Sequence, residues 1–321
     1  CSSDLNVCGL TVLSRVPAHT IYIQEINMNR RFTKLSLALI ALVLGMVIAP
    51  SANAQEEGAA GEGPDFSLDF SLDFTTQYVF RGINQEDQGL IFQPGVEFGL
   101  NVYEAAGEAK GPSSVDFIVG IWNSVHDGPT GNATPGQGIW YEADVYFGLS
   151  ATCGKYTADL TYTNYSSPGG GFAGDVDEIS VGISYDDSGA WGKEDFALNP
   201  SVLVAFEING FAEGTQEGIY LELGIEPGFE LVADKVTLTF PIVLGLSLDD
   251  YYEDASGDNE TFGYLDLGVV ATVPMDFIPA KFGAWEASAG VHVLLLGDSN
   301  ETINGGDDNE VIATFGIGIG F

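Results

Sequence analysis

Residues 309–321 read NEVIATFGIGIGF, and this stretch decides the fold class of the chain. Apolar side chains occupy its odd positions: Val311, Ala313, Phe315, Ile317, Ile319 and Phe321. Polar residues and glycine occupy its even positions: Glu310, Thr314, Gly316, Gly318 and Gly320, with Ile312 as the exception. A period of two residues predicts a β-strand with one apolar face. Such a strand fits the last strand of a soluble sandwich or of a membrane barrel, so the upstream chain must decide.

The same alternation recurs upstream and predicts twelve strands in total. Their ranges are 66–82, 90–102, 115–125, 139–151, 155–165, 177–185, 196–208, 218–228, 236–248, 262–273, 285–296 and 309–321. In the first range, the apolar face holds Phe66, Leu68, Phe70, Leu72, Phe74, Tyr78 and Phe80. Pro94, Pro200 and Pro241 fall inside these ranges and predict local bulges, because proline lacks the amide donor of a sheet ladder.

The pattern favours an antiparallel transmembrane β-barrel of about twelve strands over a soluble periplasmic β-sandwich. The apolar faces are almost uninterrupted, and the opposite faces carry glycine and carboxylates rather than Lys and Arg. Aromatic residues recur near strand ends, as barrel girdles do, and Gly/Asp/Asn-rich connections alternate with shorter ones. We therefore expect the apolar faces to contact membrane lipid. Ending on Phe321, the last strand resembles the closing strand that the barrel-assembly machinery recognises.

The N-terminal region predicts export. Met28 is followed by Arg30, Arg31 and Lys34, an apolar run and the sequence Ala52-Asn53-Ala54, which together make a signal peptide over residues 28–54. We interpret residues 1–27 as a mis-called upstream extension, 55–64 as a flexible linker and 65–321 as the outer-membrane barrel of a Gram-negative bacterium.

Charge and cysteine content limit the functions open to the chain. Lys and Arg number 10 against 46 Asp and Glu, a net charge of −36, which excludes nucleic acid as a partner because phosphates need cationic neutralisation. Only Cys153 follows the signal peptide, so no internal disulfide or cysteine-based metal site is expected.

Residues 78–85 read YVFRGINQ and resemble a motif of the Gcw_chp family of uncharacterised outer-membrane-type proteins. Gln93-Pro94-Gly95, residues 119–124 (VGIWNS) and residues 141–144 (YEAD) are similar to later blocks of that family. The resemblance covers roughly residues 65–185. It implies a barrel in the outer membrane, without an established activity or transported substrate.

If the apolar faces contact lipid, the opposite faces line the lumen with acids. The lumen-side acids are then Asp69, Asp73, Glu97, Asp116, Glu142, Asp144, Asp159, Glu178, Glu207, Glu222, Glu226, Asp266, Glu286 and Glu310. Carboxylates in a pore favour cations. The sequence therefore predicts a small porin-like channel for cationic or neutral solutes. The alternative is a non-conducting structural or adhesive barrel whose lumen is filled by its own side chains and whose acidic outer loops bind partners or calcium. Arg81 lies among these acids, and we expect it to pair with a neighbouring carboxylate.

Other polar groups suggest weaker hypotheses. Acidic outer loops hold candidate calcium ligands: Asp249, Asp250, Glu253, Asp254, Asp258, Asp307 and Asp308. Their spacing does not match the calcium-loop pattern, so solvated loops are the better interpretation. Ser288 and His292 share a strand face with Glu286, but no nucleophile motif surrounds them. We expect no enzymatic activity, no catalytic residues and no cofactor.

Overall fold

The computed structural model describes residues 66–105, 111–127, 138–172, 174–191, 196–212, 214–232 and 235–321. The predicted upstream extension, signal peptide and linker lie outside these residues. Within the described part, no helix is long and apolar enough to cross a membrane.

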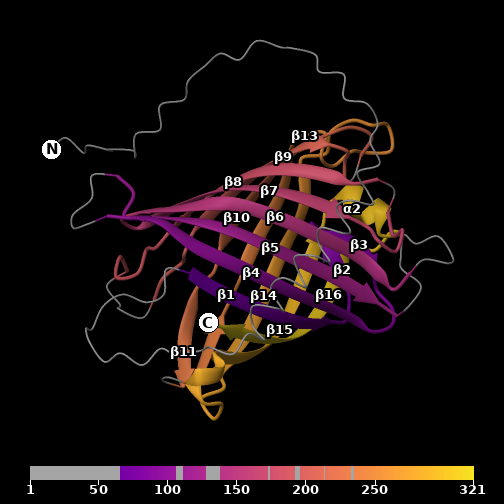
Figure 1. Cartoon of the computed structure of the whole chain (residues 1–321). Helices are drawn as coiled ribbons and strands as arrows, with labels where there is room; N and C mark the ends of the chain where they lie inside the picture. Colours follow the sequence, from indigo (N-terminus) through magenta and orange to yellow (C-terminus); the bar gives the residue numbers. More distant parts are fainter. Residues whose placement is uncertain are drawn as a thin grey trace, which may run out of the picture.

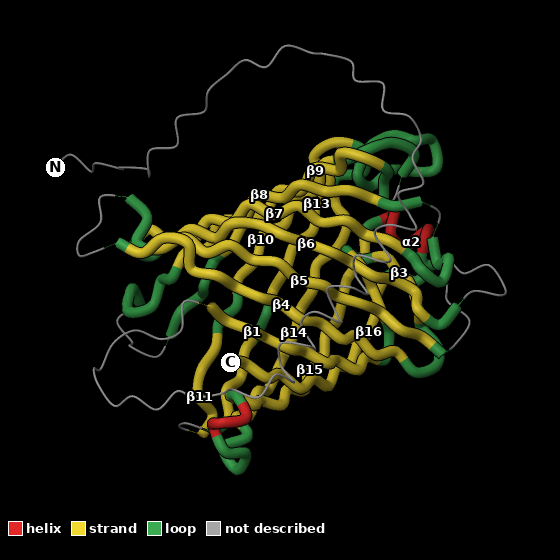
Figure 2. Tube along the Cα trace, viewed as in Figure 1, coloured by secondary structure: helices red, strands yellow, loops and turns green. Residues whose placement is uncertain are grey.

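The described strands close into a twelve-stranded antiparallel barrel (Figure 1), which confirms the predicted fold class. The wall consists of β1 (Phe66–Thr75), β4 (Ile91–Glu104), β5 (Ser114–His126), β6 (Trp140–Cys153), β7 (Tyr156–Ser166), β8 (Val176–Tyr185), β9 (Ser201–Asn209), β10 (Ile219–Ile225), β13 (Ile242–Asp249), β14 (Phe262–Pro274), β15 (Ala284–Leu296) and β16 (Asn309–Gly320). Each strand pairs with its neighbour in this order, and β1 pairs with β16 to close the barrel. Figure 2 shows the strands running around the whole tube.

The prolines affect the wall as expected in one place and differently in others. The predicted strand 236–248 divides at Phe240-Pro241 into β12 (Val236–Thr239) and β13, and the strand paired with it divides into β10 and β11 (Gly228–Val232). Around Pro94 the β4–β5 ladder skips two pairs while keeping its register. Pro200 precedes β9, because that strand begins at Ser201 rather than at the predicted residue 196.

The first predicted strand was too long, and its end was placed on the wrong face. β1 ends at Thr75, and the chain then forms a separate hairpin of β2 (Tyr78–Phe80) and β3 (Ile83–Glu86). Its turn has positive φ at Arg81 (47°) and Gly82 (83°). Tyr78, expected to face lipid, is only 7% exposed and packs on Trp122 inside the barrel. The apolar alternation of the sequence continues from β1 through Tyr78 and Phe80, but the turn at Arg81 and Gly82 reverses the chain direction.

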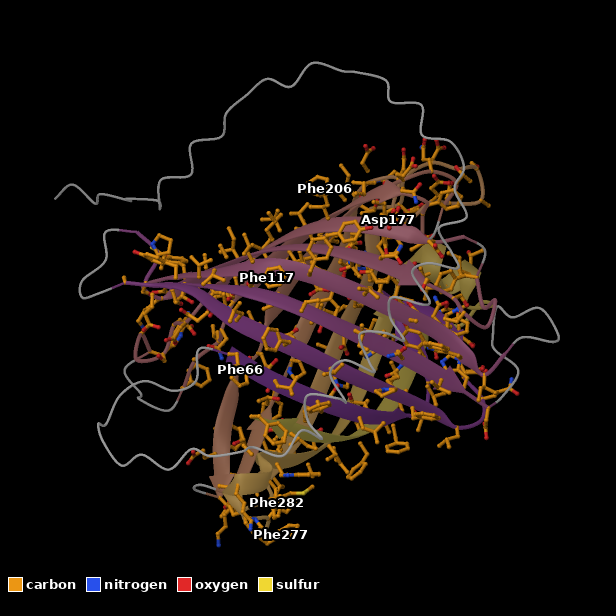
Figure 3. The ribbon with its side chains drawn as sticks, in the orientation of Figure 1. Phe66, Phe117, Asp177, Phe206, Phe277 and Phe282 are labelled. Carbon is orange, nitrogen blue, oxygen red and sulfur yellow. The ribbon has the colours of Figure 1, made fainter. Side chains whose placement is uncertain are left out.

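The outer side of the wall is an apolar surface. Large side chains exposed there include Phe66, Leu100, Phe147, Leu149, Val181, Phe206 and Leu223. Figure 3 shows Phe66, Phe117 and Phe206 spread over the wall, with Phe277 and Phe282 at one rim. A closed barrel leaves no open sheet edge, which is what the hydrocarbon layer requires of a spanning sheet. The apolar belt and the closure together make this a transmembrane barrel.

The two rims differ. At one, which we call the terminal rim, β1 starts and β16 ends: the Leu68 amide donates to the Phe321 carbonyl at 3.3 Å, and the reverse bond is 3.0 Å. This rim also carries the tight β6–β7 turn at Gly154 and the short helix η1 (Ala280–Phe282). The other, the loop rim, carries the β2–β3 hairpin, helix α2 (Asp298–Ile303) and most of the longer connections.

Candidate functional site

The β2–β3 hairpin lies inside the lumen at the loop rim, and neighbouring loops hold its turn. The Tyr252 hydroxyl donates to the Arg81 carbonyl at 2.9 Å, and the Asn300 amide donates to the same carbonyl at 3.2 Å. The Asn304 amide donates to the Gly82 carbonyl at 3.1 Å. A side chain at Gly82 would collide with Asn300, so the close grip of α2 on the turn requires glycine. The hairpin is thus fixed through its backbone.

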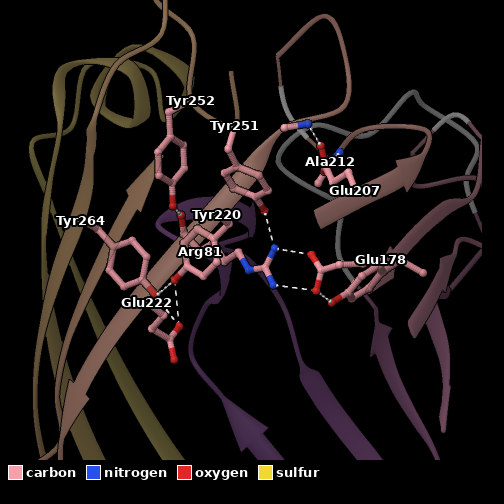
Figure 4. A network of polar contacts seen from close by, with 11 residues as sticks. Arg81, Glu178, Glu207, Ala212, Tyr220, Glu222, Tyr251, Tyr252 and Tyr264 are labelled. Atoms are coloured by element: carbon pink, nitrogen blue, oxygen red, sulfur yellow. Dashed lines mark hydrogen bonds and ion pairs between the residues drawn. The ribbon is translucent and has the colours of Figure 1, made fainter. Parts of the chain in front are cut away.

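The Arg81 side chain reaches across the lumen to the far wall (Figure 4). Its Nη1 lies 2.6 Å from Glu178 Oε2 and its Nη2 lies 3.0 Å from Glu178 Oε1, so the pair is bidentate. Nη1 also donates to the Tyr251 hydroxyl at 3.0 Å, and the guanidinium lies 4.1 Å from the centre of the Tyr220 ring. This is the carboxylate pair expected for Arg81, and its partner lies on β8.

A tyrosine layer surrounds this ion pair. Tyr220, Tyr251 and Tyr252 are almost fully buried and belong to one core cluster with Tyr264. The Tyr220 hydroxyl is 2.9 Å from that of Tyr264 and donates to Glu222 Oε2 at 2.8 Å. Glycine makes room for these rings, because a side chain at position 245 would collide with Tyr264 and one at position 263 with Tyr252. The lumen at the loop rim is therefore largely filled.

On the opposite side of the hairpin, Tyr78 is the central contact. Its hydroxyl donates to Glu142 Oε2 at 2.8 Å, and its ring contacts Trp122, His126 and Tyr141. Glu142 and the neighbouring Asp144 are both buried within the barrel. The predicted lumen acids Glu142 and Asp144 thus support the hairpin rather than face an open channel.

Toward the terminal rim the lumen contains a cavity of about 530 Å³, which we call the larger cavity because it exceeds the second lumen cavity described below. Asp69 of β1, Glu97 of β4 and Glu286 of β15 line this cavity. The Tyr146 hydroxyl donates to Glu97 Oε2 at 2.8 Å. Gly318 and Gly320 form the adjoining wall, and Gly320 pairs in register with Asp69. Barrel closure brings these predicted acids together around one space.

A smaller cavity of about 270 Å³ lies between the hairpin and β14–β16. Its lining includes Arg81, Asp266 and His292, and His292 Nδ1 lies 2.9 Å from Asp266 Oδ2. His292 is therefore partnered by Asp266 rather than by Ser288, the serine on its own strand face.

Four more of the predicted lumen acids lie at separate points of the wall. Asp73 pairs in register with Gly316, and Asp159 with Gly182. Asp116 accepts a hydrogen bond of 2.9 Å from Asn101. Glu310 accepts one of 3.4 Å from Asn304, the residue that also grips the hairpin.

The acidic outer loops do not assemble a calcium site in the part of the chain that the structure describes. No group of three or more Asp, Glu, His or Cys side chains there could hold a metal ion. Asp250 instead accepts a hydrogen bond from Gln216, and Glu253 accepts one from Thr215. Asp254 accepts the amides of Asp258 and Ser256, and these hydrogen bonds lower the pKa of its carboxyl. Asp249, Asp307 and Asp308 likewise gather no set of ligands.

The family model described as a bacterial protein of unknown function, Gcw_chp, matches residues 58–242. The chain belongs to the Gcw_chp family. The YVFRGINQ motif that carries the resemblance forms the inward hairpin, from Tyr78 of β2 to Gln85 of β3. In this Gcw_chp chain, the match also extends beyond the residues 65–185 that the sequence blocks indicated. No curated protein matches it.

Solved structures similar to this Gcw_chp barrel are outer-membrane β-barrels. An outer membrane channel from Pseudomonas putida F1 is 9% identical with a TM-score of 0.49, covering 84% of this chain and 100% of that one. The translocator domain of the autotransporter NalP from Neisseria meningitidis is 11% identical with a TM-score of 0.36, covering 90% and 97%. An anion-selective porin from Comamonas acidovorans is 10% identical with a TM-score of 0.30, covering 80% and 98%.

Proposed function

We propose that the chain is an outer-membrane channel whose acidic lumen prefers cations and whose β2–β3 hairpin narrows the passage at the loop rim. One observation carries the cation preference: the larger cavity is lined by Asp69, Glu97 and Glu286. Among the described residues, the basic side chain inside the lumen is Arg81, and Glu178 offsets its charge. Rings of carboxylates attract cations and repel anions in a pore.

None of the other described basic side chains lines the larger cavity. Lys155, Lys235 and Lys281 are exposed and lie in turns or the short helix at the terminal rim. Small cationic or neutral solutes are therefore the proposed cargo.

The proposed orientation places the loop rim outside the cell and the terminal rim in the periplasm. Outer-membrane barrels carry long external loops and short periplasmic turns, and the tight Gly154 turn fits the periplasmic side. In this arrangement the apolar belt contacts membrane lipid. The barrel-assembly machinery would read the last strand and Phe321 from the periplasm.

Planar-bilayer recording of the refolded chain in a KCl gradient tests the proposal. The unaltered chain should give discrete openings with a cation-selective reversal potential. Asp69→Asn with Asp73→Asn should move that potential toward zero, because both carboxylates lie on the lumen face of β1. The matched control is Glu230→Gln, an exposed acid of β11. Absent openings, or a potential that the double variant leaves unchanged, would contradict the proposal. Heat-modifiable gel mobility checks that every variant is folded.

A specific observation favours a second candidate, a non-conducting structural or adhesive barrel. The hairpin and the tyrosine layer fill the lumen at the loop rim, as described for Tyr220, Tyr251 and Tyr252. Such a barrel would present its acidic outer loops to partners. It predicts no openings even when the hairpin is released by removing Arg81, whereas the channel predicts larger ones.

A further inference from the structure

A pocket separate from the two lumen cavities lies at the loop rim, between the hairpin and the outer loops. Its volume is about 250 Å³. Its lining includes five aromatic side chains and one acid: Phe80, Tyr141, Tyr165, Phe172, Phe211 and Glu142. They come from β2, β6, β7 and the loops that follow β7 and β9, so the pocket exists only when the hairpin is seated.

The aromatic rings line the pocket from the edge of a small core cluster, in which Phe80 and Phe172 pack against Tyr141. Phe80 and Tyr165 meet edge to face with centroids 5.5 Å apart, and Tyr141 and Phe172 do so at 6.0 Å. Phe211 is 45% exposed. Ring faces are the electron-rich part of an aromatic side chain and attract cations within about 6 Å of the centroid.

The acid in this pocket has no cationic partner in the described part of the chain. Glu142 is 4% exposed and accepts the Tyr78 hydroxyl, while no ion pair includes Glu142 or Asp144. The neighbouring Asp144 is 7% exposed and shares a side-chain hydrogen bond with Glu142, while its Oδ1 has no further partner. Arg81 cannot serve them, because both of its terminal nitrogens are bound to Glu178. The negative charge of this buried acid pair has no counter-charge, which is unfavourable, and a bound cation would relieve this.

We propose that this pocket binds a small organic cation, an ammonium group carried on an apolar or aromatic body. The body would lie against Phe172 and Phe211 while the ammonium group faces Glu142. An inorganic cation could use the carboxylate but not the apolar walls. The volume, below the usual range for drug-sized ligands, limits the body to about one ring. Binding here does not require conduction, so the inference goes beyond the proposed channel.

Titration calorimetry of the full refolded chain with phenylethylammonium chloride tests the site, and 2-phenylethanol serves as the neutral counterpart. The ammonium compound should bind at least about tenfold more tightly than the alcohol, as expected for a partly buried cation–π and carboxylate site. Glu142→Gln and Phe172→Ala should each weaken the ammonium compound by about tenfold or more. Phe277→Ala, at the exposed terminal rim, should leave binding unchanged.

Glu142→Gln could weaken the hydrogen bond from Tyr78 and so disturb the fold. Phe172 lies in a loop, so Phe172→Ala tests the pocket without changing the barrel wall. Equal affinity for the two compounds, no binding at all, or unchanged affinity in both pocket variants would overturn the inference. A conducting chain that fails to bind the ammonium compound refutes this site alone. Binding without conductance refutes the channel alone.

Discussion

Replacing Arg81 with methionine tests whether one ion pair keeps the hairpin in the lumen. The side chains of Arg81 and Glu178 are 11% and 4% exposed, so the pair is buried. Without Arg81, the Glu178 carboxylate retains a hydrogen bond from Tyr165 at 3.2 Å but no cation. Removing one partner of a buried pair costs about 3–5 kcal/mol, because it leaves an uncompensated charge. The ratio of displaced to seated hairpin should therefore rise by about two to three and a half powers of ten.

The double variant Arg81→Met with Glu178→Gln separates the charge effect from lost packing. It leaves no buried charge unpaired, so the hairpin should be more stable than in Arg81→Met alone. It will not recover fully, because the contact of Arg81 with the Tyr220 ring is also lost. Lys155→Met, at an exposed turn, is the matched control for loss of a basic side chain.

Amide hydrogen exchange of residues 78–86, followed by mass spectrometry in detergent micelles, reports the displaced population directly. Exchange should be fastest in Arg81→Met, intermediate in the double variant and slow in Lys155→Met and the unaltered chain. Single-channel recording of the same proteins should show larger openings in the same order. Exchange that stays within about twofold of the unaltered chain in Arg81→Met, or is equally fast in both Arg81 variants, would refute the reasoning.

Three further predictions concern the surroundings of the hairpin and one turn. Asn304→Ala removes the side-chain amide that donates to the Gly82 carbonyl, so the exchange assay should report about 1 kcal/mol less protection of the hairpin. Thr302→Ala is the control, and unchanged exchange in Asn304→Ala would show that this hydrogen bond does not hold the hairpin. Gly245→Val drives a side chain into the Tyr264 ring and should cost about 1–3 kcal/mol. It should lower the folded fraction in heat-modifiable gels more than Gly111→Val, where an added side chain meets open space. At Asp187, burial opposes ionisation, but hydrogen bonds from Trp191, Asn199 and Leu198 lower the pKa of the carboxyl. The carboxylate therefore stabilises its turn above the ordinary Asp pKa of about 4 and loses this effect as the pH falls through the lowered value. Tryptophan fluorescence should change only below about pH 4, and a change at higher pH, or one that persists in Trp191→Phe, would contradict the assignment.

The wall of the barrel was predictable because its sequence signal is local. Each strand alternates between lipid and lumen, so the pattern in residues 309–321 and its upstream counterparts gave the strand number and the faces. The hairpin was not predictable in the same way, because Tyr78 and Phe80 continue the alternation of β1. What turns them inward are Tyr252 and Asn300, which follow Arg81 by 171 and 219 residues. No local pattern contains those contacts.

The site was predictable only as a set of acids. Face alternation put Asp69, Glu97 and Glu286 in the lumen, but their meeting around one cavity depends on the closure of β1 against β16 and β15. The tyrosine layer escaped prediction because tyrosine also suits the membrane interface, so Tyr220 and Tyr264 carried no clear signal. Arg81 was expected to pair with an acid, yet the choice of Glu178 depends on the turn that directs the guanidinium across the lumen.

The reach of Arg81 also has a mechanical consequence. The hairpin follows β1, whereas its ion-pair partner lies on β8, and the strand order places these on opposite sides of the tube. A thin-walled cylinder under lateral bilayer pressure flattens into an ellipse before its wall tears. The hairpin acts as a strut across the diameter and keeps the cross-section round at the loop rim. The larger cavity lies toward the terminal rim, beyond that strut, so the barrel wall should flex there while the loop rim stays rigid.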